Sequence, residues 1–181
     1  MIHHGAADPS RHLETMIETL ALCDQRYTLT MMLIPNNSAY TKRLMALSEK
    51  IVSGRVTFLD PVTPSEIIQT ISGFDLGFYP LRPRNFNQQI ALPNKFFDFL
   101  AAGLAVCIGP SSSMAQLVKK YRCGVIADSF EPEELSRVLN QTTKDQWDEM
   151  KKASQAAAKV LNAEIEMGKV LQIYNKIFSE D

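Results

Sequence analysis

The sequence predicts an α/β protein: a doubly wound, Rossmann-like parallel sheet of about six strands, with helices on both faces and a C-terminal helical tail. Short apolar runs alternate along the chain with longer segments whose apolar residues recur at helical spacing, which is typical of repeated strand–helix–strand units. The 181 residues are 45% hydrophobic and 22% charged, a composition that favours a folded core and excludes disorder. We therefore expect residues 1–181 to form a single domain.

Six apolar runs are predicted as strands, and the first begins at residue 1. They lie at residues 1–4, 28–34, 56–59, 76–79, 105–108 and 124–126. Right-handed crossovers between them predict the strand order 3-2-1-4-5-6. This order places the first and fourth strands side by side, and ligands bind beyond the carboxyl ends of strands at such a switch point. The loops at residues 4–10 and 80–94 are therefore expected to line a ligand crevice.

Helices are predicted between and after these strands. They lie at residues 11–23, 38–52, 64–72, 95–102, 113–121, 132–140, 145–161 and 165–178. The third has the clearest start, because Thr63 suits an N-cap, Pro64 the first helical position and Glu66 the closing position of a capping box. Gly103 is expected to cap the end of the fourth helix. The polar, basic segment at residues 81–89 is predicted as a loop, either functional or simply mobile.

Bulk charge and cysteine usage narrow the partners and the compartment. The formal net charge of −1 gives no overall attraction to nucleic acid or to an anionic membrane, so neither is expected as a direct partner. Three widely spaced cysteines form neither a zinc motif nor a disulfide framework, which favours a reducing compartment. No apolar run approaches the ~18 residues of a membrane span. The first residues, MIHHGAADPSR, lack the pattern of a signal peptide, so we expect the cytoplasm.

Two basic residues are the first candidates for a binding site. Arg11 is predicted to open the first helix and Lys95 the helix after the fourth strand, with Asn94 beside it, so both cations face the same crevice. A cation at a helix N-terminus opposes the helix dipole by a few tenths of a kcal/mol, which is reasonable where an anion binds. Two cations and two helix N-termini would hold a diphosphate. The alternative is that each is a solvated surface cation.

Three further residues are candidates by position. Asp98 lies one turn after Lys95 and is expected either to accept hydrogen bonds from a ribose diol or to form an i, i+3 salt bridge with Lys95. Gly5 ends the first predicted strand, where the backbone can approach a ligand closely. Pro61 follows the third strand, and its loop is expected either to hold a nucleobase against Pro61 and Val62 or to be an ordinary apolar loop of the kind that commonly follows a strand.

No pattern in the sequence identifies catalytic or metal-binding residues. There is no Ser–His–Asp arrangement, no metal-ligand spacing and no pair of carboxylates suited to acid–base chemistry. His3 and His4 alternate across the first strand, so they cannot both face one ligand, and a core or edge role is expected for them.

Three segments carry a resemblance to a known family. GAADPSRHLETMIETL, from Gly5, resembles the pattern G-R…K-G-L-E-x-L-I-E-A-L. RVTFLDPVTPSEIIQTISGFDLGFYP, from Arg55, is similar to V-x-F-x-G-x-V…E-L-x-x-x-Y-x-x-A-D-L-x-V-x-P, and PNKFFDFLAAGLAVCI, from Pro93, to P-x-K-x-x-E-x-x-A-A-G-x-P-V-V. Over nearly its whole length the chain thus resembles the C-terminal, nucleotide-sugar-binding domain of group 1 glycosyltransferases with the GT-B fold.

The resemblance implies a set of roles for single residues. Arg11 takes the place of a lysine that binds the donor phosphate, and Asp98 that of a glutamate that contacts the donor ribose. The family's phosphate-binding arginine falls at Ala6. The glutamate that usually touches the donor sugar falls at Ile90, and the resemblance leaves Asn87 and Gln89 of the nearby loop as its substitutes.

The resemblance also implies the chemistry and the partners. The family transfers a sugar from a nucleotide-diphosphate donor with retention of anomeric configuration, without a metal or other cofactor, and cations with helix N-termini stabilise the diphosphate leaving group. An N-terminal domain binds the acceptor and supplies a catalytic histidine. That acceptor domain is absent from this chain and would provide any membrane contact, at the inner membrane face. Because the first strand begins at residue 1, we expect this chain to be a fragment of a longer protein.

We therefore interpret the chain as the donor-binding half of a retaining glycosyltransferase for cell-surface polysaccharide or glycolipid synthesis. On its own it would bind a nucleotide diphosphate and transfer nothing. Two alternatives stay open. One is a non-catalytic Rossmann-like module that has lost the donor site, as Ala6 and Ile90 suggest. The other is a nucleotide-sugar epimerase of the same fold, which would need a complete two-domain chain and its own catalytic carboxylates.

Overall fold

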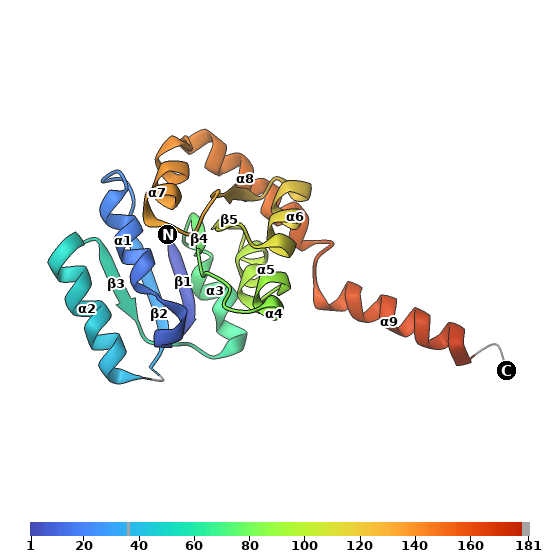
Figure 1. Cartoon of the computed structure of the whole chain (residues 1–181). Coiled ribbons are helices and arrows are strands. Elements are labelled where there is room, and N and C mark those ends of the chain that lie inside the picture. The colour runs from blue at the N-terminus through green and yellow to red at the C-terminus, as the bar shows by residue number, and fades with distance from the viewer. Residues whose placement is uncertain (36, 179–181) are drawn as a thin grey trace.

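The computed structural model, which describes residues 1–35 and 37–178, has one parallel sheet of six strands with helices on both faces (Figure 1). The strands are β1 (Ile2–Ala6), β2 (Leu29–Ile34), β3 (Val56–Leu59), β4 (Leu76–Tyr79), β5 (Ala105–Ile108) and β6 (Gly124–Ile126). Their spatial order is β3-β2-β1-β4-β5-β6. The predicted fold class and strand order are confirmed, with β1 and β4 adjacent at the switch point.

The helices form two layers. Their bounds are α1 (Glu14–Leu22), α2 (Ser38–Val52), α3 (Ile67–Ile71), α4 (Phe86–Ile90), α5 (Asn94–Ala101), α6 (Ser112–Tyr121), α7 (Pro132–Gln141), α8 (Lys144–Ala158) and α9 (Ala163–Phe178). α1 packs against α2 and α7 on one face of the sheet, whereas α5 packs against α3 and α8 on the other. Covered on both sides, β4 and β5 are buried along their whole length, as central parallel strands are.

The core between the sheet and α5 depends on one glycine. Gly77 of β4 lies directly beneath the ring of Phe99, and a Cβ atom at this position would lie 2.3 Å from a ring carbon. Phe96, Phe99 and Leu100 of α5 are fully buried. The flat backbone at Gly77 therefore lets α5 approach the sheet closely enough to fix the position of its first turn.

Several boundaries differ from the sequence prediction. The first helix does not begin at Arg11: a 3-10 turn, Pro9–Arg11, is closed by His12 in the left-handed region, and α1 starts at Glu14. The cause is local: Asp8 starts the turn by accepting the amide hydrogen of Ser10, and His12, with a φ of 49°, ends it, because a left-handed residue cannot continue a right-handed helix. The first strand is also longer than predicted and includes Gly5.

In two other segments, side-chain caps start short helical turns. The predicted capping box is present, with Thr63 and Glu66 bonded reciprocally, but it caps a 3-10 turn (Pro64–Glu66) that precedes a short α3. The predicted loop at residues 81–89 contains the single-turn helix α4, which Asn85 caps by accepting the amide of Gln88. Gly103 follows α5 with a φ of 73°, as expected for a C-terminal cap.

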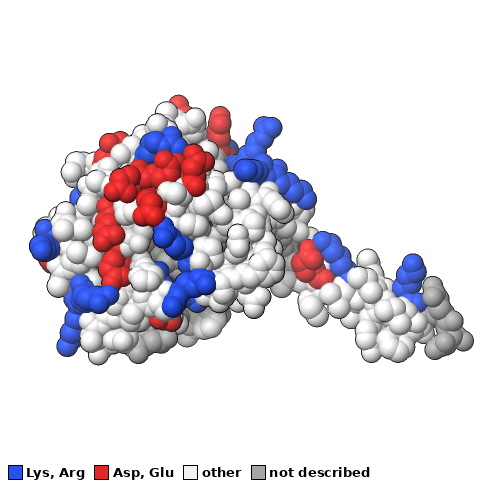
Figure 2. Space-filling view, in the orientation of Figure 1, with Lys and Arg blue, Asp and Glu red and all other residues white. Residues whose placement is uncertain are grey.

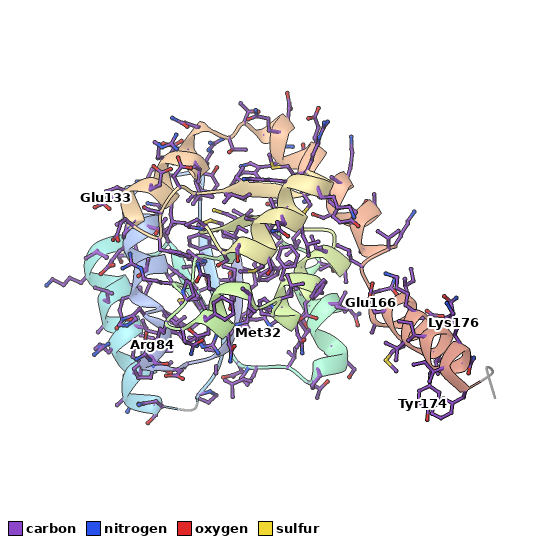
Figure 3. All side chains as sticks on the ribbon, turned by 45° about the vertical axis from the view of Figure 1, so that its right-hand side comes forward. Met32, Arg84, Glu133, Glu166, Tyr174 and Lys176 are labelled. Atoms are coloured by element: carbon purple, nitrogen blue, oxygen red, sulfur yellow. The ribbon has the colours of Figure 1, made fainter. Side chains whose placement is uncertain are left out.

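Both helices predicted as the C-terminal tail are present, but only α9 projects away from the body of the molecule (Figure 1). The other, α8, packs against α5 and β5 and belongs to the body. The apolar side chains of α9 are largely exposed, and the side of this helix visible in Figure 2 is mostly uncharged. The ring of Tyr174, which stands clear of the body in Figure 3, is tilted against that of Phe178, 4.5 Å away between centroids. In the part of the chain that the structure describes, no helix is both long and apolar enough to cross a bilayer.

Gly77→Ala is expected to lower the free energy of unfolding by about 1–3 kcal/mol, because the added methyl group overpacks the core against Phe99. Gly73→Ala is the matched control, since open space surrounds its Cβ position, and a change within about 0.5 kcal/mol is expected. Urea denaturation of both variants measures the difference. Equal effects would show that α5 does not depend on close contact at Gly77.

Candidate functional site

The seam between β1 and β4 opens toward the carboxyl ends of the strands. β1 pairs with β2 through five residues, but with β4 only at Ile2 and Gly77, whereas β4 pairs with β5 through four. Backbone groups along the open seam must find other partners, because buried ones are rarely left unpaired. Two side chains supply them. His3 places Nδ1 3.0 Å from the carbonyl oxygen of Phe78, and Lys95 donates from Nζ to the carbonyl of His4 at 2.6 Å.

Lys95 occupies this seam in place of a neighbouring strand. The residue lies in the first turn of α5, and its ammonium group rests against Gly5, where a Cβ atom would lie only 2.4 Å from Nζ. Gly5 has a φ of 133°, a conformation that side chains disfavour. The predicted role of Gly5 in a close approach is thus realised toward Lys95. Burial, and after it the charge of Arg11, lower the pKa of Lys95 to about 8.

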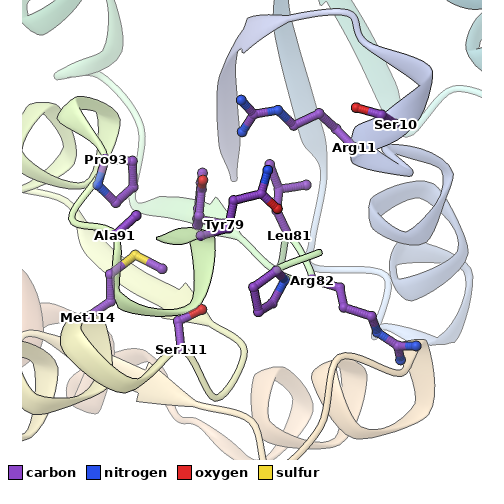
Figure 4. A pocket seen from close by; sticks show the side chains of 11 residues that line it. Ser10, Arg11, Tyr79, Leu81, Arg82, Ala91, Pro93, Ser111 and Met114 are labelled. Carbon is purple, nitrogen blue, oxygen red and sulfur yellow. The ribbon is translucent and has the colours of Figure 1, made fainter. Parts of the chain in front are cut away.

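Arg11 and Lys95 converge on the same end of the sheet, as predicted, although Arg11 reaches it from the 3-10 turn. Tyr79, at the end of β4, is the common neighbour: Lys95 Nζ lies 5.4 Å from its ring centroid, and the Arg11 guanidinium counteracts the rise that burial causes in the Tyr79 pKa. Arg11 and Tyr79 line one pocket of about 180 Å³ (Figure 4). Its other lining residues are Ser10, Leu81, Arg82, Pro83, Gln88, Ala91, Pro93, Ser111 and Met114.

The start of α5 is open toward the same region. Pro93 occupies the N-cap position and supplies no side-chain acceptor, although its carbonyl accepts the amide of Phe96, so the amides of Asn94 and Lys95 are left to bind an anion. Among the described residues, no carboxylate oxygen lies within 4 Å of the Lys95 ammonium or the Arg11 guanidinium. Two cations and one helix N-terminus thus create a positive site that no acidic side chain neutralises directly.

Asp98 lies one turn further along α5 and faces β1. Its Oδ2 is 3.5 Å from Nε2 of His4, so the structure contradicts the alternative of a direct salt bridge between Asp98 and Lys95. Burial raises the pKa of Asp98, and the charge of Lys95 opposes this shift. The His4 side chain is buried, and its Nε2 has no hydrogen-bond partner. Burial, followed by the charge of Lys95, lowers the pKa of His4 to about 4, so its imidazole is neutral at pH 7.

The remaining predicted residues are less close to this centre. Asn94 is exposed in the first turn of α5, and Pro61 is exposed in the loop after β3; neither lines the pocket of Arg11 and Tyr79. Asn87 and Gln89 are exposed on α4, and their neighbour Gln88 lines the pocket instead. Gln88 is held there because its Oε1 accepts the amide hydrogen of Arg84.

Three pocket residues, Tyr79, Ser111 and Met114, lie outside the segments that the sequence predicted to line the crevice. Tyr79 could have been found, because it is the last residue of the strand at the switch point. Ser111 could not, since it enters the pocket from the loop after β5, outside the two loops expected to line the crevice. A second hollow shares Arg11 and Arg82 with the first, and there Arg82 is paired with Glu131. Across residues 1–35 and 37–178, no three His, Cys, Asp or Glu side chains gather as metal ligands would.

Known structures share this fold. HepE of Anabaena, in complex with UDP, matches with a TM-score of 0.77 and 18% identity over 98% of this chain and 48% of its own. WaaG, a glycosyltransferase involved in lipopolysaccharide biosynthesis, gives 0.67 and 18% over 89% and 43%. The C-terminal domain of LpcC, a group 1 glycosyltransferase of Francisella tularensis, gives 0.69 and 11% over 88% and 84%. The chain thus spans about half the length of HepE and WaaG.

Sequence comparison identifies the family. A search of curated proteins finds no match to this chain. The model of the family described as "Glucosyltransferase 3-like, C-terminal domain" matches residues 36–172, which is most of the chain. The resemblance seen in the sequence and the GT-B neighbours agree with this match. The chain belongs to the glucosyltransferase 3-like C-terminal domain family and has the fold of the C-terminal domain of GT-B group 1 glycosyltransferases.

Proposed function

We propose that this chain binds the nucleotide-diphosphate sugar donor of a glycosyltransferase. The observation that carries the proposal is the convergence of Arg11, Lys95 and the uncapped start of α5 on one end of the sheet, where no carboxylate of the described residues pairs with either cation. Such a site favours a compact, multiply charged anion. HepE, which shares the fold, is known in complexes with UDP and with UDP-glucose, in keeping with a donor of this class.

The charged groups suit the diphosphate in both binding and reaction. Sugar transfer breaks the bond between the anomeric carbon and the β-phosphate oxygen, so negative charge develops on the leaving diphosphate. Fixed cations and amides placed where this charge grows lower the barrier without reorganising. Lys95 is well suited because its ammonium is already held by the His4 carbonyl. We propose retention of anomeric configuration on the basis of the family pattern.

The pocket is sized for part of a donor. Its volume of about 180 Å³ is below the roughly 300–1,000 Å³ typical of ligand cavities. We infer that it receives the β-phosphate and the edge of the sugar, near Gln88 and Ser111. The ribose is assigned to Asp98. A separate N-terminal domain would supply the acceptor-binding site and the rest of the sugar site, which fits the half-length match to HepE and WaaG.

The two alternatives explain less of the site. A module that had lost its donor site would have no reason to keep two cations beside an open helix N-terminus, since like charges in partial burial cost stability. An epimerase would need a set of catalytic carboxylates near the anion site, and among the described residues Asp98 is the acidic group whose charge acts on Lys95. WaaG acts in lipopolysaccharide biosynthesis, which makes a cell-surface glycan or glycolipid the product class we propose.

Calorimetry with UDP, GDP and ADP tests the proposal on this chain. We expect at least one diphosphate to bind, and Arg11→Gln and Lys95→Gln each to weaken binding about 10- to 100-fold, the loss of a charge-assisted hydrogen bond. Lys151→Gln is the control, because Lys151 pairs with Asp75 at the opposite end of β4. A folded chain that binds none of the three at millimolar concentration would contradict the proposal.

The affinity for the diphosphate is expected to fall as the pH rises from 7 to 9. The pKa of Lys95 is about 8, so its ammonium is mostly charged at the lower pH and mostly neutral at the higher one. The affinity falls at most about tenfold over this range. A bound anion raises the pKa of Lys95, so the midpoint of the fall lies above the pKa of the free chain. Lys95→Arg keeps the charge at both values and should bind with little pH dependence. The same decline in both proteins would show that another group titrates.

A further inference from the structure

We propose that His4 is a positioning residue that orients the Asp98 carboxylate toward the ribose of the donor. The inference rests on the proposed function, because it assumes that a nucleotide occupies the site. His4 contacts both of the α5 side chains assigned to the donor. Its backbone carbonyl holds Lys95, and its imidazole faces Asp98.

The first support is the position of the imidazole. His4 is 6% exposed, and its Nε2 has no hydrogen-bond partner although it lies 3.5 Å from Oδ2 of Asp98. An unsatisfied buried ring nitrogen costs free energy, and a small rotation of the Asp98 side chain would form the missing bond. The remainder of the imidazole is fixed, because its ring packs edge-on against Phe99 at 5.3 Å between centroids.

The second support is that one of the two carboxylate oxygens of Asp98 stays available to a ligand. With Nε2 as donor, His4 takes one oxygen of Asp98 and leaves the other free. Asp98 remains about a quarter exposed, at 26% of its side chain, so a ligand can reach it. A neutral imidazole suits this task, because it donates a hydrogen bond without cancelling the negative charge that binds a diol. The low pKa of His4 keeps it neutral at physiological pH.

The third support is that the neighbouring histidine does not share this arrangement. His3 is equally buried but points to the other side of β1, where Nδ1 meets the carbonyl of Phe78. His3 therefore completes the seam, whereas His4 has a ring nitrogen left for a side chain of the site. The two residues provide a matched pair for experiment, with the same chemistry, the same strand and different partners.

The test compares the affinities of UDP, 2′-deoxy-UDP and inorganic pyrophosphate for the whole chain. In the native protein, UDP is expected to bind about tenfold more tightly than 2′-deoxy-UDP, and Asp98→Asn should remove most of this preference. His4→Met should reduce the preference to about two- to threefold, because the carboxylate is no longer oriented. Pyrophosphate affinity should stay unchanged in His4→Met, since Lys95 is held by the backbone of residue 4.

Two variants separate positioning from a purely structural role. His4→Gln places an amide N–H near the position of Nε2 and should restore most of the preference for UDP over 2′-deoxy-UDP. His3→Gln should lower stability yet leave the preference as in the native chain. Methionine is chosen at position 4 because it adapts to the cavity beside Phe99, and His4→Leu replaces it if that variant does not fold.

The outcomes distinguish this inference from the proposed function. If the native chain binds UDP and prefers it to the deoxy analogue, but His4→Met retains that preference, the positioning role is wrong and the donor site stands. A native chain that binds both nucleotides equally also overturns the role of His4. If neither UDP nor pyrophosphate binds to the folded native chain, both proposals fail together.

Discussion

The open seam between β1 and β4 is the constraint on which the rest of the site depends. Two strands that pair at one position leave a row of backbone groups that must be satisfied before they can be buried. The chain solves this with side chains: the His3 ring meets a carbonyl of β4, and the Lys95 ammonium binds a carbonyl of β1. The second bond requires Gly5, because any Cβ there would collide with Lys95 Nζ. The bond that closes the sheet is thus the same bond that fixes a cation at its carboxyl edge, so fold and site share one stabilising contact.

The same arrangement leaves the positive charge of the site without a directly paired carboxylate. Lys95 is partly desolvated and lies within the field of Arg11, and both effects lower its pKa. A carbonyl oxygen satisfies one of the three ammonium hydrogens but adds no negative charge. Asp98 would be the natural counter-ion, yet its carboxylate faces His4. The protein therefore keeps a positive potential that an incoming anion can neutralise, at a modest cost to the stability of the unliganded chain. Phe99 fixes this geometry. Its ring packs on Gly77 and so holds α5 close to the sheet, and the same ring contacts the imidazole of His4.

The fold was predictable from the sequence because its signals are local. The runs at β3, β4, β5 and β6 are short, apolar and closely bounded by turn residues, so their limits agree with the structure, and the strand order follows from the handedness of crossovers. The predicted bounds are wrong where a side chain caps a short helical turn that the sequence pattern did not reveal. Asp8 caps a 3-10 turn that ends at Arg11, and Asn85 starts a helix inside a predicted loop. The convergence of Arg11 and Lys95 was predicted through topology. The contact between His4 and Asp98 was not, because it depends on the register of β1 against α5, which no spacing in the sequence encodes.

The departures from the family pattern have a structural counterpart. Ala6 removes a phosphate-binding arginine, and Ile90, at the end of α4, removes the glutamate that contacts the donor sugar; both are absent from the pocket lining. What the pocket presents in their place is Tyr79, Gln88 and Ser111, which are neutral hydrogen-bonding groups. Of the two guanidinium groups in its lining, that of Arg82 is paired with Glu131, which leaves that of Arg11 for a ligand. Neutral donors and acceptors discriminate between sugars through hydroxyl orientation rather than through charge, because an unpaired buried polar group is costly. In the function that we propose, the charge for the diphosphate is concentrated in Arg11 and Lys95, and the neutral wall of the pocket would contact the sugar. Under this proposal, the lost acidic residue would narrow the range of donors without removing the cations that hold one.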